Sequence, residues 1–159
     1  MGAGAGPEVS IRCYRPGDID RLHAIDRICF DESIAYSRAE LLYYLRHPRA
    51  VGKVAERAAS IVGFALGRIE EKLFGHVITL DVMPEARRCG IGAALLESLH
   101  ADFRSAGLPV AVLEVDVANT GAQRFYQRWG YEQVETLRGY YNGGRDAYRM
   151  VCFLRSGRR

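Results

Sequence analysis

Apolar residues in the first half of the chain recur at the spacing of a strand, then of two helices, then of strands again. Residues 9–14 alternate as a strand does, and Leu22, Ile25 and Cys29 follow at helical spacings of three and four. The run Ser37-Arg38-Ala39-Glu40 has capping-box spacing, in which the hydroxyl and the carboxylate each bind a free backbone N–H, so it predicts a second helix. Two short strands then follow, over 50–56 and 61–69, and predict a hairpin.

The middle of the chain predicts two successive strand-helix units. A strand over 76–82 precedes a helix over 92–104, whose apolar side chains recur at four-residue intervals. A second strand, over 108–117, precedes a helix that Asn119 caps and Gly130 ends in a left-handed conformation.

The last two predicted strands, 133–141 and 146–154, flank Asn142-Gly143-Gly144, which is typical of a hairpin turn. Hairpins require antiparallel strand pairs, whereas crossover helices allow parallel ones. The order of elements therefore predicts an α/β fold with a mixed sheet.

Composition limits the classes of protein without choosing one. The 159 residues are 48% hydrophobic and 26% charged, so we expect one domain over 9–154, with a disordered lead-in at 1–8 and a flexible basic tail at 155–159. The formal net charge of +3 is too small for a dedicated nucleic-acid binder, and no apolar run could span a membrane. We therefore expect neither nucleic acid nor a membrane as a partner.

The cysteines and histidines predict neither disulfides nor a metal site. The four cysteines are far apart in the sequence and form no CxxC pair, which indicates reduced thiols in a cytoplasmic protein. The histidines at 23, 47, 76 and 100 show no metal-ligand spacing, so we assign no metal. The sequence does not indicate the oligomeric state.

A glycine turn joins the strand over 76–82 to the next helix through Arg87-Arg88-Cys89-Gly90-Ile91-Gly92. Glycine lets the backbone approach a ligand, and the free N–H groups and positive dipole of a helix start favour a phosphate. The alternative is a short connection that uses glycine only for packing. A Walker A loop is absent, and the third glycine of a dinucleotide fingerprint would stand where Leu95 does.

Glu114 and Tyr126 each allow two interpretations. Glu114 shares one face of its strand with Val110, Val112 and Asp116, and an acid among apolar residues needs a partner or a function. It is either a general base or a group that is solvated or paired with an arginine. Tyr126 is either a catalytic acid or a core residue whose hydroxyl is satisfied.

The motifs of the second half together resemble the GCN5-related N-acetyltransferases, the GNAT family. The branch that acetylates protein N-termini, including the ribosomal-protein-alanine acetyltransferases, is the most similar because of the C-terminal motifs. The motifs that carry the resemblance are Leu80 to Ala93 with Arg87-x-x-Gly90-x-Gly92, Leu113-Glu114-Val115, Asn119-x-x-Ala122-x-x-Phe125-Tyr126, Gly130-Tyr131, Arg138-Gly139-Tyr140-Tyr141, Asp146-Ala147 and Met150.

The resemblance implies a GNAT fold, with a mostly antiparallel sheet of about six or seven strands and about four helices, and acetyl-CoA as the acyl donor. The glycine turn would bind the pyrophosphate, and the strand before it would bind the pantetheine arm through its main chain. The implied cofactor-binding residues are Leu80, Asp81, Val82, Arg87, Arg88, Cys89, Gly90, Ile91, Gly92, Ala93 and Asn119.

The same resemblance implies that an amine attacks the thioester directly, with Glu114 as general base and Tyr126 as general acid. Tyr140 and Tyr141, together with the loop from Phe30 to Tyr36, would border the acceptor, and Glu114 and Asp116 would give the site a negative floor. We expect the acceptor to be the α-amine of a protein N-terminus. The alternatives are a small amine such as an aminoglycoside, polyamine or amino acid, and a non-catalytic acyl-CoA-binding module.

Overall fold

A computed structural model describes residues 8–154, so the predicted lead-in, apart from Glu8, and the predicted basic tail lie outside the described residues. In chain order its elements are β1 (Val9–Cys13), the short 3-10 helix η1 (Pro16–Asp18), α1 (Ile19–Cys29), α2 (Arg38–Leu45), β2 (Ala50–Arg57), β3 (Ser60–Glu70), β4 (Phe74–Val82), the 3-10 helix η2 (Pro84–Ala86), α3 (Ile91–Ser105), β5 (Val110–Asp116), α4 (Thr120–Arg128), β6 (Glu132–Leu137) and β7 (Ala147–Phe153).

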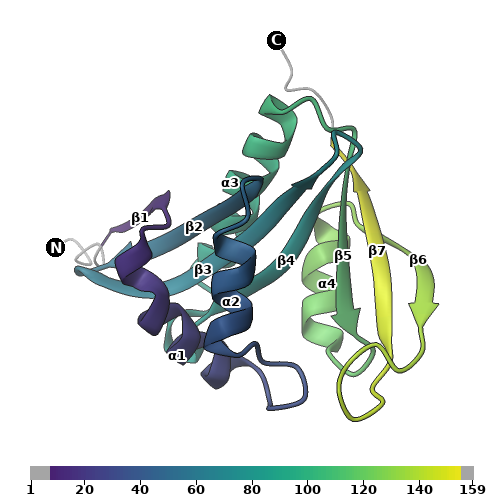
Figure 1. Cartoon of the computed structure of the whole chain (residues 1–159), viewed down its shortest axis with the longest axis horizontal. Helices are drawn as coiled ribbons and strands as arrows, with labels where there is room; N and C mark the ends of the chain where they lie inside the picture. Colours follow the sequence, from purple (N-terminus) through teal and green to yellow (C-terminus); the bar gives the residue numbers. More distant parts are fainter. Residues whose placement is uncertain (1–7, 155–159) are drawn as a thin grey trace, which may run out of the picture.

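The seven strands form one sheet in the order β1-β2-β3-β4-β5-β7-β6 (Figure 1). Every neighbouring pair is antiparallel except β4 and β5, which are parallel and are connected through α3. This arrangement is expected, because parallel neighbours need a long crossover and hairpins do not. The predicted α/β class and the mixed, mostly antiparallel sheet are confirmed.

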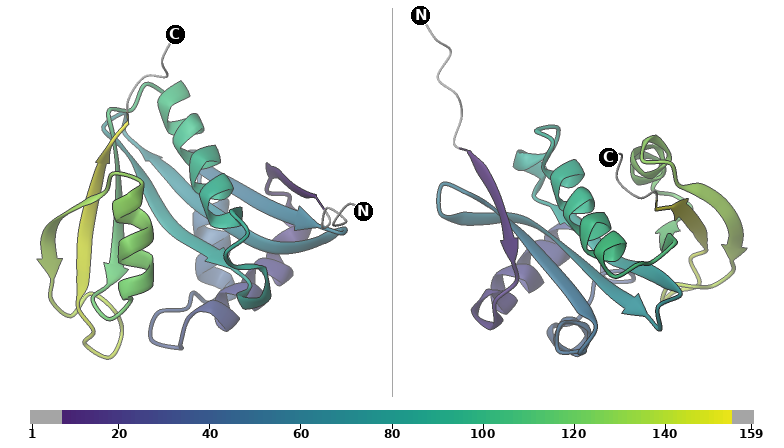
Figure 2. Two further views of the ribbon diagram at one scale, coloured as in Figure 1. Left: turned by 180° about the vertical axis from the view of Figure 1, so that it is seen from behind. Right: turned by 90° about the horizontal axis from the view of Figure 1, so that it is seen from above.

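The helices cover both faces of the sheet. Helices α1 and α2 pack on one face of the strands β2 to β4, and α3 packs on the opposite face. Figure 2 shows α4 on the same side of the sheet as α3, beside β5 and β7. The predicted capping box of α2 is confirmed, because Ser37 Oγ accepts the Glu40 N–H at 3.1 Å and Glu40 Oε1 accepts the Ser37 N–H at 3.1 Å.

Helix α3 is seated on the sheet by Phe103, which packs over two strand glycines. A Cβ at Gly75 would lie 2.3 Å from the Phe103 ring, and one at Gly67 would lie 2.9 Å from it. Only glycine allows this approach without displacing the ring. The close packing fixes the direction of α3, whose N-terminus follows shortly after the end of β4.

The sheet loses its continuity between β4 and β5. These strands pair only at Gly75 with Ala111, His76 with Val112, and Val77 with Leu113. We call the unpaired remainder, Ile78–Val82 of β4 and Glu114–Asp116 of β5, the β4–β5 split. Figure 1 shows the two strands diverging from their paired end.

A β-bulge marks the start of the split. On β3, Leu66 pairs with Thr79 and the next residue, Gly67, pairs with Val77, so Ile78 has no partner there. An extra residue in one strand bends it and increases its twist. The bulge therefore turns β4 away from β5 at the first residue beyond their last pair.

The predicted closing hairpin is only partly correct. Strands β6 and β7 pair antiparallel, but β6 ends at Leu137 and β7 begins at Ala147. The tight turn at Asn142-Gly143-Gly144 does form, with the Tyr141 carbonyl accepting the Gly144 N–H at 3.1 Å, but it lies inside a longer connection and does not join the two strands directly. Residues 138–146 form a long loop, here the β6–β7 loop. Its backbone leaves the ladder because Gly139, Gly143 and Gly144 all have positive φ and the Asp146 carboxylate accepts the Gly139 N–H at 2.8 Å.

Candidate active site

Glu114 lies at the apex of the β4–β5 split, as the first residue of β5 beyond the paired segment. Its side chain is only 9% exposed, and its Oε2 lies 2.7 Å from Nε2 of His76 on β4. Its Oε1 lies 3.6 Å from a guanidinium nitrogen of Arg149, which faces it from β7. The site therefore includes a histidine that the sequence analysis did not single out.

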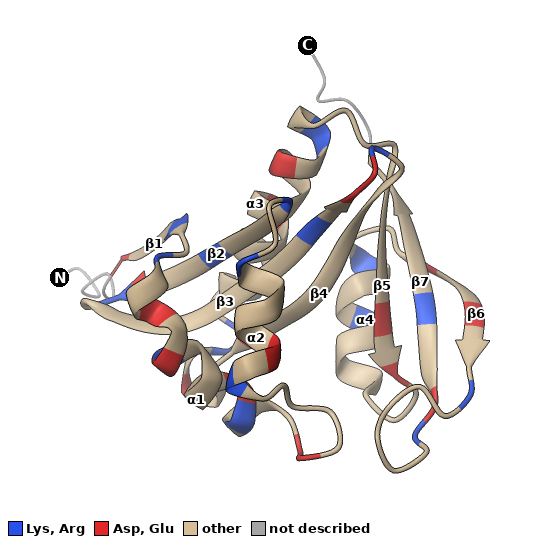
Figure 3. Cartoon of the chain, viewed as in Figure 1, with Lys and Arg blue, Asp and Glu red and all other residues tan. Residues whose placement is uncertain are grey.

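These contacts bear on the two interpretations of Glu114, a general base or a solvated or arginine-paired group. The group is not solvated, and it does have an arginine partner, but its shortest contact is to an imidazole. Figure 3 shows the acidic segment in the middle of β5 beside a basic segment of β7, in line with the Glu114 and Arg149 register. An acid with a hydrogen-bonded imidazole can exchange a proton with it, which an arginine partner alone does not allow.

Three tyrosines, Tyr44, Tyr140 and Tyr141, lie close enough to Glu114 for its charge to act on them. Partial burial first and the Glu114 charge second raise the pKa of the half-exposed Tyr140 to about 12. Burial also raises the pKa of Tyr141, with smaller effects from Tyr140, Asp116 and Glu114. The rings of Tyr36 and Tyr44 meet edge to face with centroids 5.6 Å apart. Tyr140 and Tyr141 therefore lie near Glu114, although they belong to a loop and not to a strand.

Tyr126 is buried on α4, where its ring packs against Phe125 and Tyr131. Its hydroxyl makes no hydrogen bond to any residue of the described range 8–154, so it differs from a core tyrosine with a satisfied hydroxyl. Burial, with the nearby Asp81 as the second cause, raises the pKa of Tyr126. The phenol therefore keeps its proton at neutral pH.

Asp116 does not contribute to an open negative floor, contrary to the sequence-based expectation. Its buried carboxylate pairs with Arg145 of the β6–β7 loop and accepts the Ala118 N–H at 3.0 Å. The other guanidinium nitrogen of Arg145 pairs with Asp31, in the loop over 30–37 that we call the α1–α2 loop. Asp116 thus anchors a bridge between two loops, and its charge is neutralised locally.

The glycine turn has the geometry of an anion site. Gly90 is the N-cap of α3 with φ of +78°, and no atom lies within 4 Å of the position a Cβ would take. The N–H groups of Ile91, Gly92 and Ala93 precede the first helical hydrogen bond, which runs from Ala94 to Gly90. The donors that these residues present fit a pyrophosphate.

The residues beside this turn differ in how far their polar groups are already hydrogen-bonded. Arg87 is partly committed, because its Nε donates to the Val82 carbonyl at 2.9 Å. Arg88 and Cys89 are exposed. Asn119 uses its side-chain oxygen to cap α4 through the Ala122 N–H at 3.1 Å, which leaves its NH₂ group for a ligand.

The backbone of β4 presents its free edge to the split at alternate residues. Met83 donates its N–H to the Val62 carbonyl on β3 at 2.8 Å. Because bonded and non-bonded pairs alternate in an antiparallel ladder, the backbone groups of Leu80 and Val82 point away from β3, and those of Asp81 point toward it. The backbone groups of two of the three residues predicted to bind pantetheine therefore point away from β3, and of these the Val82 carbonyl already accepts Arg87 Nε at 2.9 Å.

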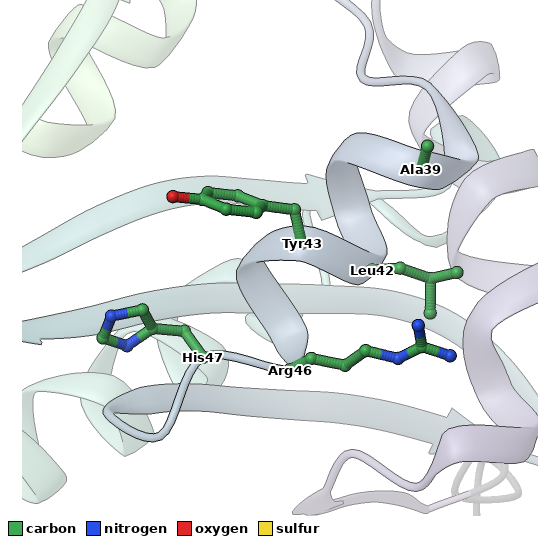
Figure 4. Close-up of a pocket in the computed structure, with 5 residues that line it drawn as sticks. All are labelled: Ala39, Leu42, Tyr43, Arg46 and His47. Atoms are coloured by element: carbon green, nitrogen blue, oxygen red, sulfur yellow. The ribbon is translucent and has the colours of Figure 1, made fainter.

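A shallow hollow of about 490 Å³ lies elsewhere, on the outer surface of α2. Its lining residues are Ala39, Leu42, Tyr43, Arg46 and His47. Figure 4 shows their side chains pointing to different sides of the helix instead of converging. The hollow contains none of the predicted site residues, so we assign it no role in the reaction. Within residues 8–154, no helix is long and apolar enough to cross a membrane.

Comparisons with known proteins agree with this geometry. The family model described as "Acetyltransferase (GNAT) family" matches residues 19–131, from the start of α1 to Tyr131. An N-alpha-acetyltransferase of Sulfurisphaera tokodaii is 34% identical over 161 aligned positions, which cover 94% of this chain and 95% of the relative.

Two solved structures share the fold. Ard1 from Thermoplasma volcanium has a TM-score of 0.86 and 27% identity, covering 93% of this chain and 99% of that one. The ribosomal-protein-alanine N-acetyltransferase of Escherichia coli has a TM-score of 0.84 and 21% identity, covering 96% and 97%. The resemblance read from the sequence motifs is thus confirmed, and the chain belongs to the GNAT family of acetyl-CoA-dependent N-acetyltransferases.

Proposed function

We propose that this N-acetyltransferase acetylates the α-amine of protein N-termini. The observation that carries the proposal is Glu114, held at the apex of the split between the free edge of β4 and a border of tyrosines. The Sulfurisphaera tokodaii relative, matched over nearly its whole length, is named for the same reaction.

The bridge between the loops also favours a chain end as acceptor. Arg145 pairs with Asp31 and Asp116, and Gly143 lies beside Ser33, so the β6–β7 loop is fastened to the α1–α2 loop. A peptide end can insert past a bridge of this kind, whereas an internal segment of a protein cannot lie across it.

We assign the binding of acetyl-CoA to backbone groups of the glycine turn and of β4. The amides of Ile91, Gly92 and Ala93 and the dipole of α3 would hold the pyrophosphate, and the backbone groups of Leu80 and Val82 would hold the arm. When bound, the cofactor supplies a thioester carbonyl as the electrophile. Backbone N–H groups near Val82 would stabilise negative charge on the carbonyl oxygen.

Glu114 and His76 would remove the proton that an amine carries at neutral pH. His76 Nδ1 lies 3.9 Å from Glu70 Oε1, so the three side chains form a row from the split outward. Their exposed fractions rise along it, from 9% for Glu114 to 19% for His76 and 25% for Glu70. The row would carry the proton to solvent, while the Tyr126 hydroxyl would donate one to the departing sulfur.

We also propose a cytoplasmic location. All four cysteines are unpaired thiols, which is the usual state in a reducing compartment.

The acceptor is tested by thiol release from acetyl-CoA with three sets of amines: peptides with a free N-terminus and an internal lysine, the same peptides with a blocked N-terminus, and small amines including spermidine, an aminoglycoside and free amino acids. We expect turnover with the first set only. Turnover with small amines alone would overturn the protein acceptor. Absence of release with every amine would favour a binding module.

Glu114→Gln should lower kcat by about 100-fold or more, because general base catalysis contributes factors of this order. Acetyl-CoA affinity, measured by calorimetry, should stay unchanged. Glu135→Gln is the matched control, since Glu135 binds the same Arg149 at 2.8 Å from the exposed side. A wild-type kcat in Glu114→Gln, or an equal loss of kcat in both variants, would contradict the role of Glu114 as general base.

Tyr126→Phe should slow the chemical step by about tenfold or more while the fold is kept, because only a hydroxyl without a protein hydrogen bond is deleted. Tyr131→Phe is the matched control, because that hydroxyl is bound to His100 Nε2 at 2.6 Å. Single-turnover kinetics should show a loss in Tyr126→Phe and a wild-type rate in Tyr131→Phe. The reverse pattern would contradict the acid role.

Gly90→Val should weaken coenzyme A binding by about tenfold or more, because a β-branched residue resists positive φ and shifts the amides of the turn. Gly107→Val is a close control, since Gly107 also has φ near +77° and open space around it but lies at the far end of α3. Both variants should lose similar stability, and only Gly90→Val should lose affinity in calorimetry. Equal affinities would contradict the phosphate site.

A further inference from the structure

Two buried carboxyl groups meet behind the split and take no part in the proposed proton transfers. Asp26 on α1 is 0% exposed and Asp81 on β4 is 1% exposed. Each has one fully buried carboxyl oxygen without a hydrogen-bond donor, and Asp26 is, after burial, the main cause that raises the pKa of Asp81. The bulge at Ile78 makes this meeting possible, because Gly75 faces α3 whereas Asp81, an even number of residues further along, faces α1.

Of the four carboxyl oxygens of Asp26 and Asp81, two have no hydrogen-bond donor. Asp26 Oδ2 accepts the Tyr36 N–H at 2.6 Å, and Asp81 Oδ1 accepts the Thr79 hydroxyl at 2.6 Å. Asp26 Oδ1 and Asp81 Oδ2 are fully buried and have no hydrogen-bond partner while both groups are ionised. One proton between these two oxygens satisfies both.

The surroundings supply no ion-pair partner that could replace this proton, and the Arg87 charge is the smallest of the influences on the pKa of Asp81. Within residues 8–154, neither carboxyl group forms an ion pair. The groups that face the pair are the Cys29 thiol from α1, the Tyr36 and Tyr126 phenols, and Arg87, whose Nε is bound to the Val82 carbonyl. Burial first and Asp26 second raise the pKa of Asp81 well above its ordinary value. Two acids in contact in an apolar environment hold a proton in this way.

We propose that Asp26 and Asp81 share one proton in the working enzyme, and that this bridge positions the α1–α2 loop against the strand that binds the acetyl donor. Asp81 Oδ2–H donates to Asp26 Oδ1, and Asp26 in turn holds the Tyr36 backbone. Tyr36 packs on Tyr44, beside Glu114. The two acids are positioning residues and do not contact the reacting atoms.

Loss of the shared proton at alkaline pH should loosen the acceptor side first. Two like charges in one apolar site repel α1 from β4, and the Tyr36 end of the α1–α2 loop depends on Asp26. The KM for the acceptor should therefore rise at alkaline pH more than the KM for acetyl-CoA. This part of the inference rests on the proposed function.

Asp81→Asn tests the bridge directly, because its NH₂ group donates to Asp26 at the position of the acid O–H while its oxygen still accepts from Thr79. Infrared difference spectra near neutral pH should show the carbonyl band of a protonated carboxylic acid in the wild type and no such band in Asp81→Asn. Asp116→Asn, which alters a buried acid held by Arg145, should leave the band in place. A missing wild-type band, or one that persists in Asp81→Asn, would overturn the shared proton.

Stability provides a second readout that needs no substrate. The folded pKa of Asp81 is raised above the ordinary 3.8, so its contribution to stability is complete below 3.8 and falls as pH rises through the folded value. Asp81→Asn lacks this decline. The free energy of unfolding of Asp81→Asn should therefore increase relative to that of the wild type as pH rises from acid to alkaline. Parallel pH curves for the two proteins would contradict the bridge.

Kinetics test the positioning role. Between neutral and alkaline pH, the acceptor KM should rise by about fivefold more in the wild type than in Asp81→Asn, with kcat changing alike in both. Equal KM profiles would overturn positioning. If Asp81→Asn does not fold, Asp26→Asn replaces it, since its amide can accept from Tyr36 and donate to Asp81, and the same band should vanish. The spectra and unfolding curves do not depend on the acceptor, so a failed bridge is distinguishable from a failed function.

Discussion

The separation of β4 from β5 after three residue pairs is the constraint on which the site depends. Each strand keeps its outer neighbour, β3 or β7, so both strands stay hydrogen-bonded in the sheet while their two inner edges lose their partners. Backbone groups on such edges are tolerated only where water or a ligand satisfies them. The split therefore supplies donors and acceptors for an extended ligand and, at its apex, a protected position for Glu114.

Charge in the site is balanced locally, which explains why the net charge of +3 indicated no partner. The amides and arginines of the glycine turn suit an anionic cofactor. Asp116 is neutralised by Arg145, so of the two acids on β5 only Glu114 remains for the acceptor, next to His76 and Arg149. One acid with an imidazole partner moves protons more readily than two free acids, whose charges oppose further ionisation.

The features that could be predicted from the sequence are those that interactions between neighbouring residues determine. The capping box at Ser37 and the left-handed Gly130, with φ of +92°, follow from neighbouring residues, so their signals are complete in the sequence. The contact of His76 with Glu114 joins residues 38 positions apart and depends on a parallel register that the bulge limits. The tight turn at Asn142-Gly143-Gly144 was predicted, but the length of the β6–β7 loop around it was not, because bonds from Asp146 and Arg145 to distant residues hold the flanking chain outside the ladder.

The bulge also explains how consecutive residues of β4 face the two sides of the proposed site. Leu80 and Val82 turn their backbone groups to the split, while the Asp81 side chain between them reaches α1 and, through Asp26, the Tyr36 backbone. The donor strand and the border of the acceptor are thus connected through one side chain. Coupling between binding sites is reciprocal. Under the proposed assignment, an acceptor that tightens the α1–α2 loop would favour the position of β4 that binds the donor.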